Sequence, residues 1–236
     1  MTLQQVEPKK IYIRVDEQWW QPWANTVAYY PFDWDVNDHS WNNRNLTAYT
    51  GSMSYGNLTD GQYWIFNGST ILTTHNMVSL NSGTLTMWSL YSNTSDGTVF
   101  CNNYDENNMS YYSNFMAIDS GTTMFVPYSE WSFGSTARLV ATGTYSANQW
   151  YFQTVTSDGS TLSYYLNGQY VTSKSTSFFM NMANINQWCV WGLKRWSQTY
   201  SILNWWVSNL IIENKCWTAQ EVVDYYNQTK SNYGIS

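Results

Sequence analysis

Charged residues are what this sequence has least of. Asp, Glu, Lys and Arg make up 11% of its 236 residues, whereas about a quarter is usual in a globular domain. The 10 Lys and Arg residues are thinly spread and the formal net charge is −6. The basic surface that binds the phosphates of nucleic acids is therefore lacking, which excludes a nucleic-acid-binding protein.

Cysteine is also scarce. The three cysteines, Cys101, Cys189 and Cys216, are an odd number and are far apart. Such spacing suggests neither a disulfide framework nor a zinc site. At most one pair could be joined, and free buried thiols are the simpler interpretation.

Long apolar runs are missing throughout the chain. No segment is long and apolar enough for a membrane span, and residues 1–15 lack the apolar stretch and cleavage site of a signal peptide. For a chain that acts outside the cell, the missing secretion signal leaves three explanations: a processed form, a protein exported by an unconventional route, or a virion protein. We favour the virion protein, and expect a virion or extracellular surface as its location.

Aromatic residues, in contrast, are abundant: they make up 19% of the chain and include 15 Trp and 20 Tyr. With so little charge, the surface must consist of Asn, Ser, Thr, Tyr and Trp. Flat rings among hydrogen-bonding groups suit neutral polyhydroxyl ligands or extensive protein contacts.

Strand-like runs separated by Gly, Asn and Ser predict one large all-β domain. The expected strands are residues 11–15, 27–32, 63–66, 83–91, 98–102, 110–118, 137–145, 149–156, 162–166, 190–193 and 207–212. Alternation, as in Leu85 and Met87 against Thr86 and Trp88, gives each such strand an inward face and an outward face that can carry aromatic side chains.

Two local signals predict particular elements near the C-terminus. Asn167-Gly168 is a hairpin turn that should pair residues 164–166 with residues 170–172. Thr218, followed three residues later by Glu221, is a capping box that starts a short helix. The order of these elements, from a strand that opens on Trp150 to the final helix, points to a sugar-binding fold family.

The chain resembles the laminin G-like group of the concanavalin A-like lectin and glucanase superfamily. Residues 27–33 and 38–43 look like that group's first strand and following turn, although Trp41 stands where Gly is usual. Residues 63–68 look like a second landmark, and residues 150–226 resemble the closing half.

The resemblance covers nearly the whole chain, from about residue 27 to residue 233. It implies a jelly-roll β-sandwich of two antiparallel sheets with a concave face. In this family many members bind glycans, some need calcium, some cleave glycans, and many are structural or adhesive. We expect residues 1–21 to form an N-terminal arm with several Trp residues for contact with a neighbour or the sheet edge, and residues 22–236 to form the sandwich.

Catalytic signals are weak. Retaining glycan cleavage needs two carboxylates about 5–5.5 Å apart, and the Glu-x-Asp-x-x-Glu motif of related glucanases is missing. The nearest acidic pairs are Asp33 with Asp35 and Asp105 with Glu106. His39 and His75 lie far from any Ser or Cys motif for nucleophilic catalysis. We therefore expect no catalytic residues and no enzyme.

A calcium ion is the one cofactor that the sequence leaves open. Asp33, Asp35, Asp38 and Asn42 offer the hard oxygen ligands that calcium prefers. The simpler interpretation is that Asp38 caps its own turn through backbone hydrogen bonds. We assign no metal ligands.

The predicted ligand-binding residues lie in loops, where rings can stack on sugars beside amide donors. They are Trp34, Trp41, Asn42, Trp131, Trp196 and Tyr200.

The function that we expect is non-enzymatic glycan recognition or adhesion within a larger extracellular or virion assembly. The expected partners are a glycan and other subunits, including further copies of this chain, reached through the N-terminal arm. A purely structural decoration or scaffold subunit is the alternative, and a glycoside hydrolase of the same fold is the third.

Overall fold

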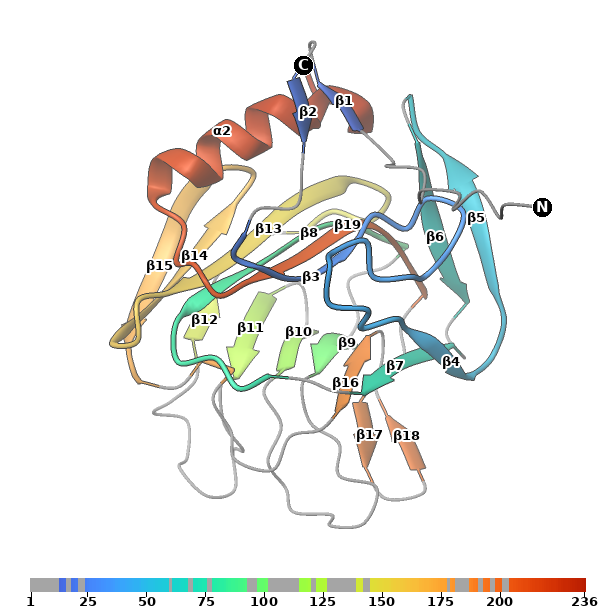
Figure 1. The fold of residues 1–236 in the computed structure, drawn as a ribbon, viewed down its shortest axis with the longest axis horizontal. Helices are drawn as coiled ribbons and strands as arrows, with labels where there is room; N and C mark the ends of the chain where they lie inside the picture. The colour runs from blue at the N-terminus through green and yellow to red at the C-terminus, as the bar shows by residue number, and fades with distance from the viewer. Residues whose placement is uncertain are drawn as a thin grey trace, which may run out of the picture.

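The computed structural model of the protein (Figure 1) describes residues 13–15, 18–20, 24–59, 61–67, 70–75, 78–92, 97–101, 115–119, 122–126, 139–141, 145–177, 179–180, 187–190, 193–195, 198–200 and 204–236. Across these residues the chain is a jelly-roll sandwich of two antiparallel sheets with a short C-terminal helix, α2 (Ala219–Thr229). This confirms the fold class predicted from the sequence.

The larger sheet has eight strands in the order β15-β14-β13-β8-β19-β6-β5, with β3 paired to β19 beside this path. Its strands are β3 (Thr26–Tyr30), β5 (Met53–Asn57), β6 (Gln62–Asn67), β8 (Gly83–Tyr91), β13 (Trp150–Ser157), β14 (Thr161–Leu166), β15 (Gln169–Ser175) and β19 (Asn204–Glu213).

The smaller sheet has seven strands in the order β12-β11-β10-β9-β16-β7-β4. They are β4 (Thr47–Thr50), β7 (Ile71–His75), β9 (Gly97–Cys101), β10 (Phe115–Asp119), β11 (Thr122–Val126), β12 (Leu139–Ala141) and β16 (Gln187–Val190). Two hairpins form small sheets of their own, β1 (Ile13–Val15) with β2 (Gln18–Trp20) and β17 (Leu193–Arg195) with β18 (Gln198–Tyr200).

The hydrophobic core lies between the two sheets. Leu85 and Val155 from the larger sheet belong to one buried cluster with Leu72 and Leu139 from the smaller sheet. Alternate residues of each strand supply this layer because successive side chains of a strand point to opposite faces. Burying each large apolar side chain contributes roughly 1.5–3 kcal/mol to stability.

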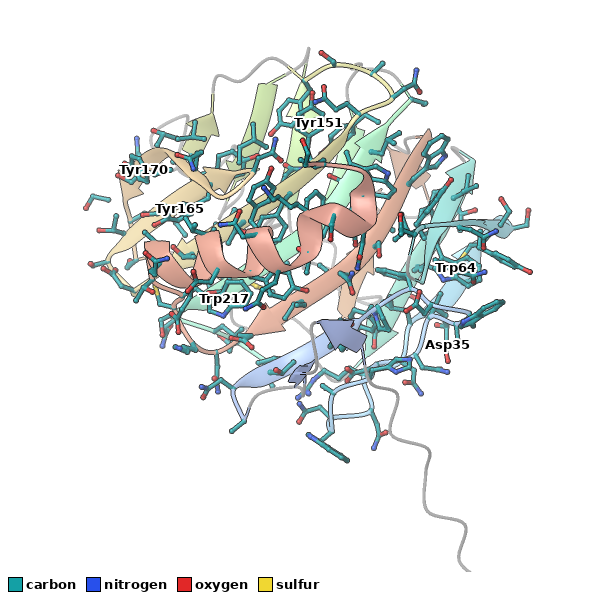
Figure 2. All side chains as sticks on the ribbon, turned by 90° about the horizontal axis from the view of Figure 1, so that it is seen from above. Asp35, Trp64, Tyr151, Tyr165, Tyr170 and Trp217 are labelled. Carbon is teal, nitrogen blue, oxygen red and sulfur yellow. The ribbon has the colours of Figure 1, made fainter. Side chains whose placement is uncertain are left out.

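The second face of the central strands, which the sequence analysis expected to carry aromatic side chains, is buried as well. Every residue of β8 is buried, and Figure 2 shows α2 lying across this face of the larger sheet. Trp88 stacks on Tyr233 with ring centroids 4.0 Å apart, and Phe152 stacks on Tyr225. The helix α2 and the turn that follows it, which contains Tyr233, therefore cover this face with aromatic side chains.

The core also contains polar atoms, and they pair with one another. The Gln153 side chain accepts hydrogen bonds from Tyr145 and Tyr164 and donates to Ser89 and Tyr91. Gln153 is completely buried, so both the oxygen and the nitrogen of its side-chain amide must find a hydrogen-bond partner inside the protein. Its position on β13 lets one side chain satisfy the hydroxyls of several buried residues.

The strand predictions are confirmed best in the larger sheet. The expected strands at residues 83–91, 149–156, 162–166 and 207–212 correspond to β8, β13, β14 and β19. In contrast, the strand expected at residues 190–193 differs from the structure, because β16 ends at Val190 and β17 begins at Leu193. The sequence analysis did not identify β4, β5, β7 and β11.

The arm predicted at residues 1–21 contains the hairpin of β1 and β2, with Ile13 opposite Trp20. The division between this arm and the sandwich stays a prediction.

The hairpin predicted at Asn167-Gly168 is confirmed. Leu166 pairs with Gln169, and both turn residues have positive φ, 51° for Asn167 and 77° for Gly168. Gly168 also lies directly against Tyr226 of α2. The turn therefore needs glycine both for its backbone conformation and for the space that the helix occupies.

Replacing Gly168 with Ala tests this double requirement. The new Cβ would lie 2.9 Å from Tyr226 Cδ1, so we expect a loss of roughly 2–3 kcal/mol of unfolding free energy from backbone strain and overpacking together. The matched control is Gly234→Ala, where φ is 72° and no atom lies within 4 Å of the new Cβ. It should lose only about 1 kcal/mol. Urea denaturation measures both, and equal losses would contradict the packing of this turn against α2.

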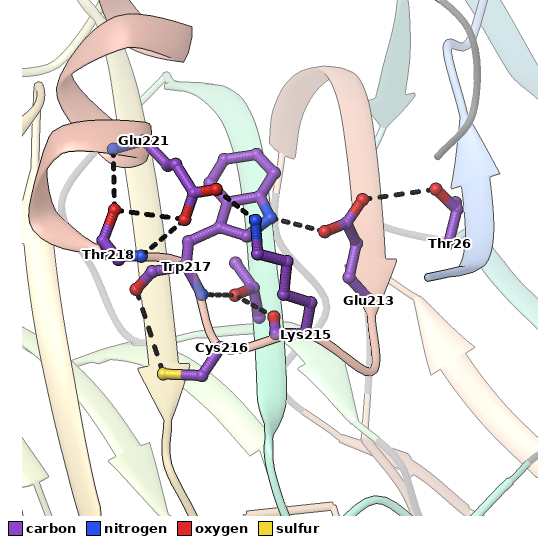
Figure 3. A network of polar contacts seen from close by, with 8 residues as sticks. Thr26, Glu213, Lys215, Cys216, Trp217, Thr218 and Glu221 are labelled. Carbon is purple, nitrogen blue, oxygen red and sulfur yellow. Dashed lines mark hydrogen bonds and ion pairs between the residues drawn. The ribbon is translucent and has the colours of Figure 1, made fainter. Parts of the chain in front are cut away.

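A buried carboxyl group anchors the start of the helix (Figure 3). Glu213 has no exposed area, and it accepts hydrogen bonds from Thr26 Oγ1 at 3.2 Å and from the Trp217 indole N–H. Burial raises the pKa of Glu213, although these two hydrogen bonds oppose the shift. The carboxyl therefore ties β19 to β3 and to Trp217, the residue before the N-cap of the helix.

The helix itself begins with the predicted capping box. Thr218 Oγ1 accepts from the Glu221 backbone N–H at 3.2 Å, and Glu221 Oε2 accepts from the Thr218 backbone N–H at 2.8 Å. Lys215 forms an ion pair with the other oxygen of Glu221. Burial acts to raise the pKa of Glu221, but Lys215 and the hydrogen bonds from Thr218 outweigh it and lower that pKa.

Glu213→Gln should change the pH dependence of stability. A raised folded-state pKa means that Glu213 contributes stability below its ordinary value of 4.5, which is lost as pH rises through the folded-state pKa. Gln cannot ionise, and its amide can accept from Trp217 and donate to Thr26. We therefore expect the Tm of the variant to exceed that of the wild type by a few degrees near pH 7 and to match it near pH 4.

Glu221→Gln is the control with the opposite sign, because the pKa of Glu221 is lowered. It should be less stable than the wild type at neutral pH, by at most about 1 kcal/mol for such an exposed pair. This difference should vanish as pH falls through the lowered pKa. Thermal melts between pH 4 and pH 7 measure the difference in Tm between each variant and the wild type. If this difference has the same sign in both variants at pH 7, the structure of this network is contradicted.

Candidate functional site

The segment between β3 and β4 is shaped by one buried aspartate. Asp38 Oδ1 accepts hydrogen bonds from the backbone N–H groups of Tyr29 at 3.0 Å and Ser40 at 2.9 Å. Its Oδ2 accepts from Ser40 Oγ and from the Arg44 backbone N–H, both at 2.8 Å. The carboxylate thus closes its own turn, as the simpler interpretation of this motif predicted.

Earlier in the same segment two residues adopt the left-handed backbone conformation. Phe32 and Trp34 both have positive φ, 62° and 67°, a conformation that costs a non-glycine residue on the order of 1–3 kcal/mol. Phe32 is buried and stacks on Tyr30, whereas Trp34 is 72% exposed. The strained backbone therefore sends one ring into the core and the next into solvent.

Trp34 begins a continuous group of exposed and half-exposed rings. Its ring centroid lies 6.0 Å from that of Tyr55 on β5, and the Tyr55 ring lies edge-on to Trp64 of β6 at 6.2 Å. Tyr55 and Trp64 are direct cross-strand partners. We call Trp34, Tyr55 and Trp64 the aromatic platform.

Two hydrogen bonds fix the loop against the hairpin of β5 and β6. The Trp64 indole N–H donates to the Asp35 carbonyl at 3.1 Å, and the backbone N–H of Gln62 donates to Asp33 Oδ1. The relative position of Trp34 and the two hairpin rings is therefore set by bonds between elements that are distant in sequence.

A carboxylate accompanies the platform. Asp35 accepts hydrogen bonds from the backbone and amide N–H groups of Asn37 at 2.9 and 2.8 Å, and its Oδ1 lies 3.1 Å from His39 Nε2. Partial burial acts to raise the pKa of Asp35, but these hydrogen bonds outweigh it and lower the pKa. The side chain is 40% exposed, so it presents a fixed negative charge to solvent at neutral pH. Figure 2 shows Asp35 and Trp64 together at one end of the molecule, with Tyr165 and Tyr170 at the other.

The predicted ligand residues fall into three groups. Trp34 lies in the platform. Trp41 is also 72% exposed, and the Asn42 amide donates to the carbonyls of Thr26 and Val27 at 2.9 and 3.1 Å. The rest are not described at the side-chain level: Trp131 and Trp196 lie outside the described residues, and Tyr200 ends β18, where the structure gives the backbone. The ligand roles of all six residues stay predictions.

Tyr55, Trp64 and Asp35 were not among the predicted ligand residues. The pairing of Tyr55 with Trp64 depends on β5, which the sequence analysis did not identify. The sequence did contain a signal for the hairpin of β5 and β6. Gly61 is a turn residue and lies between two runs that contain aromatic residues.

The acidic residues of the described part do not gather into a metal site. No three His, Cys, Asp or Glu side chains there could together hold a metal ion. Of the four residues with oxygen ligands for calcium, Asp38 closes its own turn, while Asp33 and Asp35 accept hydrogen bonds from separate donors. The Asp105-Glu106 pair lies outside the described residues.

Within the described residues, no helix is both long enough and apolar enough to pass through a membrane.

No protein-family model matches the sequence, and no curated protein matches it. Solved structures do match in fold. Domain 4 of AbnA, a GH43 extracellular arabinanase from Geobacillus stearothermophilus, in complex with arabinotriose, is 18% identical with a TM-score of 0.70, and the match covers 85% of this chain and 97% of that domain.

Two toxin domains are similar as well. The binding domain of Paraclostridial Mosquitocidal Protein 1 is 15% identical with a TM-score of 0.66, over 86% of this chain and 52% of that one. The binding domain of Botulinum neurotoxin DC in complex with SialylT is 14% identical with a TM-score of 0.65, over 86% and 51%. This chain thus spans about half the length of these toxin domains. At such identities the likeness shows the fold alone, and the chain is a β-sandwich of the kind that these binding domains share.

Proposed function

We propose that this protein is a non-enzymatic glycan-recognition module and that the aromatic platform is its binding surface. The observation that carries the proposal is the continuous run of Trp34, Tyr55 and Trp64 beside the Asp35 carboxylate. The C–H faces of a sugar ring stack on such rings, while a neighbouring polar group orients the hydroxyls. The strained backbone that exposes Trp34 supports a functional role, because strain of this kind gathers at binding sites.

The charge of the site favours a neutral glycan. Asp35 is ionised at neutral pH and accepts hydrogen bonds well, so it suits sugar hydroxyls and repels the carboxylate of an acidic sugar. His39 lies against Asp35. The Arg44 guanidinium donates to the Val27 carbonyl at 2.8 Å. The basic side chains of the described segment between β3 and β4, His39 and Arg44, thus interact with groups of the protein itself.

The fold neighbours support glycan recognition. Domain 4 of AbnA was solved with arabinotriose, and one neurotoxin binding domain was solved with SialylT. The support comes mainly from the arabinanase domain, which this chain matches over 97% of its length, whereas the match covers 51% of the neurotoxin domain. The resemblance of the sequence to the laminin G-like group points the same way.

Two carboxyl groups of the described residues support a non-enzymatic role. A glycosidase acid needs a raised pKa and access to the substrate. Glu213 has the raised pKa but no exposed area, whereas Asp35 is accessible but has a lowered pKa. Neither can act as the general acid at neutral pH.

We place this module in a larger extracellular or virion assembly, where many weak sites act together by multivalency. A structural decoration subunit is the second candidate, and the position of Tyr55 favours it. Tyr55 lies on β5, an edge strand of the larger sheet, and exposed edges and rings also suit contacts with a neighbouring subunit.

The platform is tested on a glycan array that carries neutral and sialylated oligosaccharides. We expect binding to neutral glycans, and Trp34→Ala and Tyr55→Ala should each weaken it about tenfold, which corresponds to about 1.4 kcal/mol. Tyr170→Ala is the matched control, because Tyr170 is 57% exposed against 54% for Tyr55 and lies at the opposite end of the molecule. A titration of the strongest array ligand gives the affinities.

Trp41→Ala separates the platform from the wider set of loop residues predicted from the sequence. Unchanged binding in this variant would restrict the site to the platform, while a loss equal to that of Trp34→Ala would extend it. Repeating the array with a chelator tests the calcium hypothesis. The proposal is overturned in favour of the structural subunit if two results are found together. No glycan on the array binds, and sedimentation shows that Trp34→Ala changes the oligomeric state.

A further inference from the structure

Two of the three cysteines meet in the smaller sheet. Cys101 is the last residue of β9, and Cys189 lies in β16, a strand from a distant part of the chain. The two strands pair antiparallel with Cys189 directly opposite Cys101 and Val190 opposite Phe100. The sequence spacing gives no sign of this proximity, which arises from the sheet order.

Directly opposite residues of an antiparallel pair share one face of the sheet and have Cα atoms about 4.5–5.5 Å apart. A disulfide needs a Cα separation of about 4.4–6.8 Å. On the next strand, Thr73 is opposite Cys189 and Leu72 is opposite Val190. Leu72 belongs to the core, so alternation places both cysteine positions on the other face of the sheet.

We propose that Cys101 and Cys189 are joined by a cross-strand disulfide, formed by exchange with a small-molecule disulfide such as oxidised glutathione. The thiolate of one cysteine attacks the oxidant, forms a mixed disulfide and releases one glutathione thiolate. The thiolate of the other cysteine then attacks the mixed disulfide and releases the second glutathione. Two protein thiols are oxidised and one glutathione disulfide is reduced, and the two protons lost by the cysteines are taken up by the two released glutathione thiolates.

The position of this bond gives it a structural role. The pairing of β9 with β16 contains two registered residue pairs, fewer than any other described pairing in the smaller sheet. It joins the half of the sheet from β12 to β9 to the half from β16 to β4. A covalent bond at this position closes a long loop of chain and so restricts the unfolded state strongly.

The proposed disulfide also lies close in sequence to the hairpin of β17 and β18. This hairpin begins at Leu193, soon after Cys189, and ends at Tyr200. Figure 1 shows this hairpin beyond the end of β16. The cross-link holds the strand from which the hairpin extends. Tyr200, the predicted ligand residue at the end of this hairpin, is thereby connected to a strand that the disulfide holds in place.

Cys216 serves as an internal reference. It lies after β19, is half-buried, and its Sγ donates to the Trp217 carbonyl at 3.8 Å. Burial raises the pKa of this thiol, so little thiolate is available for exchange. The inference therefore predicts one free thiol and one disulfide, and it stands independently of the glycan proposal.

Peptide mapping of the purified full chain tests the pairing. After equilibration in a glutathione redox buffer, the protein is denatured, alkylated without reduction and digested with trypsin. Cleavage after Arg44, Arg138, Lys174, Lys194, Lys215 and Lys230 places the three cysteines in separate peptides. We expect residues 45–138 linked to residues 175–194, with Cys216 alone alkylated. Three alkylated cysteines, or a link that includes Cys216, would overturn the proposal.

Stability measurements give a second readout. Reductant should lower the Tm of the wild type by about 5–15 °C, as expected for loss of a disulfide that closes a long loop in a domain of this size. Cys101→Ser and Cys189→Ser should have the lower Tm already and be insensitive to reductant, whereas Cys216→Ser should respond like the wild type. A wild type whose Tm is unchanged by reductant contradicts the cross-link. If a serine variant fails to fold, the peptide map of the wild type still decides.

Discussion

The burial of the larger sheet on both faces is the constraint on which the rest of this structure depends. The strands β8, β13 and β19 pack against the smaller sheet on one side and beneath α2 on the other. Because Trp88 stacks on Tyr226 and Phe152 stacks on Tyr225, both of α2, the sheet would expose large rings without the helix. Trp217, bonded to the buried Glu213, holds the start of the helix over this face.

Two-sided burial leaves the edges and loops of the sheet as the accessible parts. The aromatic platform lies there, on β5, β6 and the segment after β3. Its rings keep their positions because Asp33, Asp35 and Asp38 bond to backbone and indole N–H groups across these elements. Binding residues on such a loop gain from a rigid scaffold, since less conformational entropy is lost when a ligand binds.

A domain with few charged residues and many polar ones can be stable because its buried polar atoms form hydrogen bonds with one another. Gln153 satisfies several buried hydroxyls at once, and Glu213 is kept in place by two donors. Unpaired, each of these groups would cost about 1–3 kcal/mol. Among the buried side chains of the described residues, Gln62 Oε1 is the one polar atom without a hydrogen-bond partner. The low charge also leaves the exposed surface to Trp, Tyr and small polar residues.

The sequence by itself determined what depends on neighbouring residues: the all-β class, the Asn167-Gly168 hairpin, the Thr218 and Glu221 capping box, the turn of Asp38 and the candidacy of Trp34. Tertiary structure alone decided which distant segments meet. It paired Tyr55 with Trp64, brought Cys189 opposite Cys101, and covered Trp88 with the helix. Turn and cap preferences arise from local backbone geometry, whereas the pairing of strands depends on how apolar faces from the entire chain are buried together.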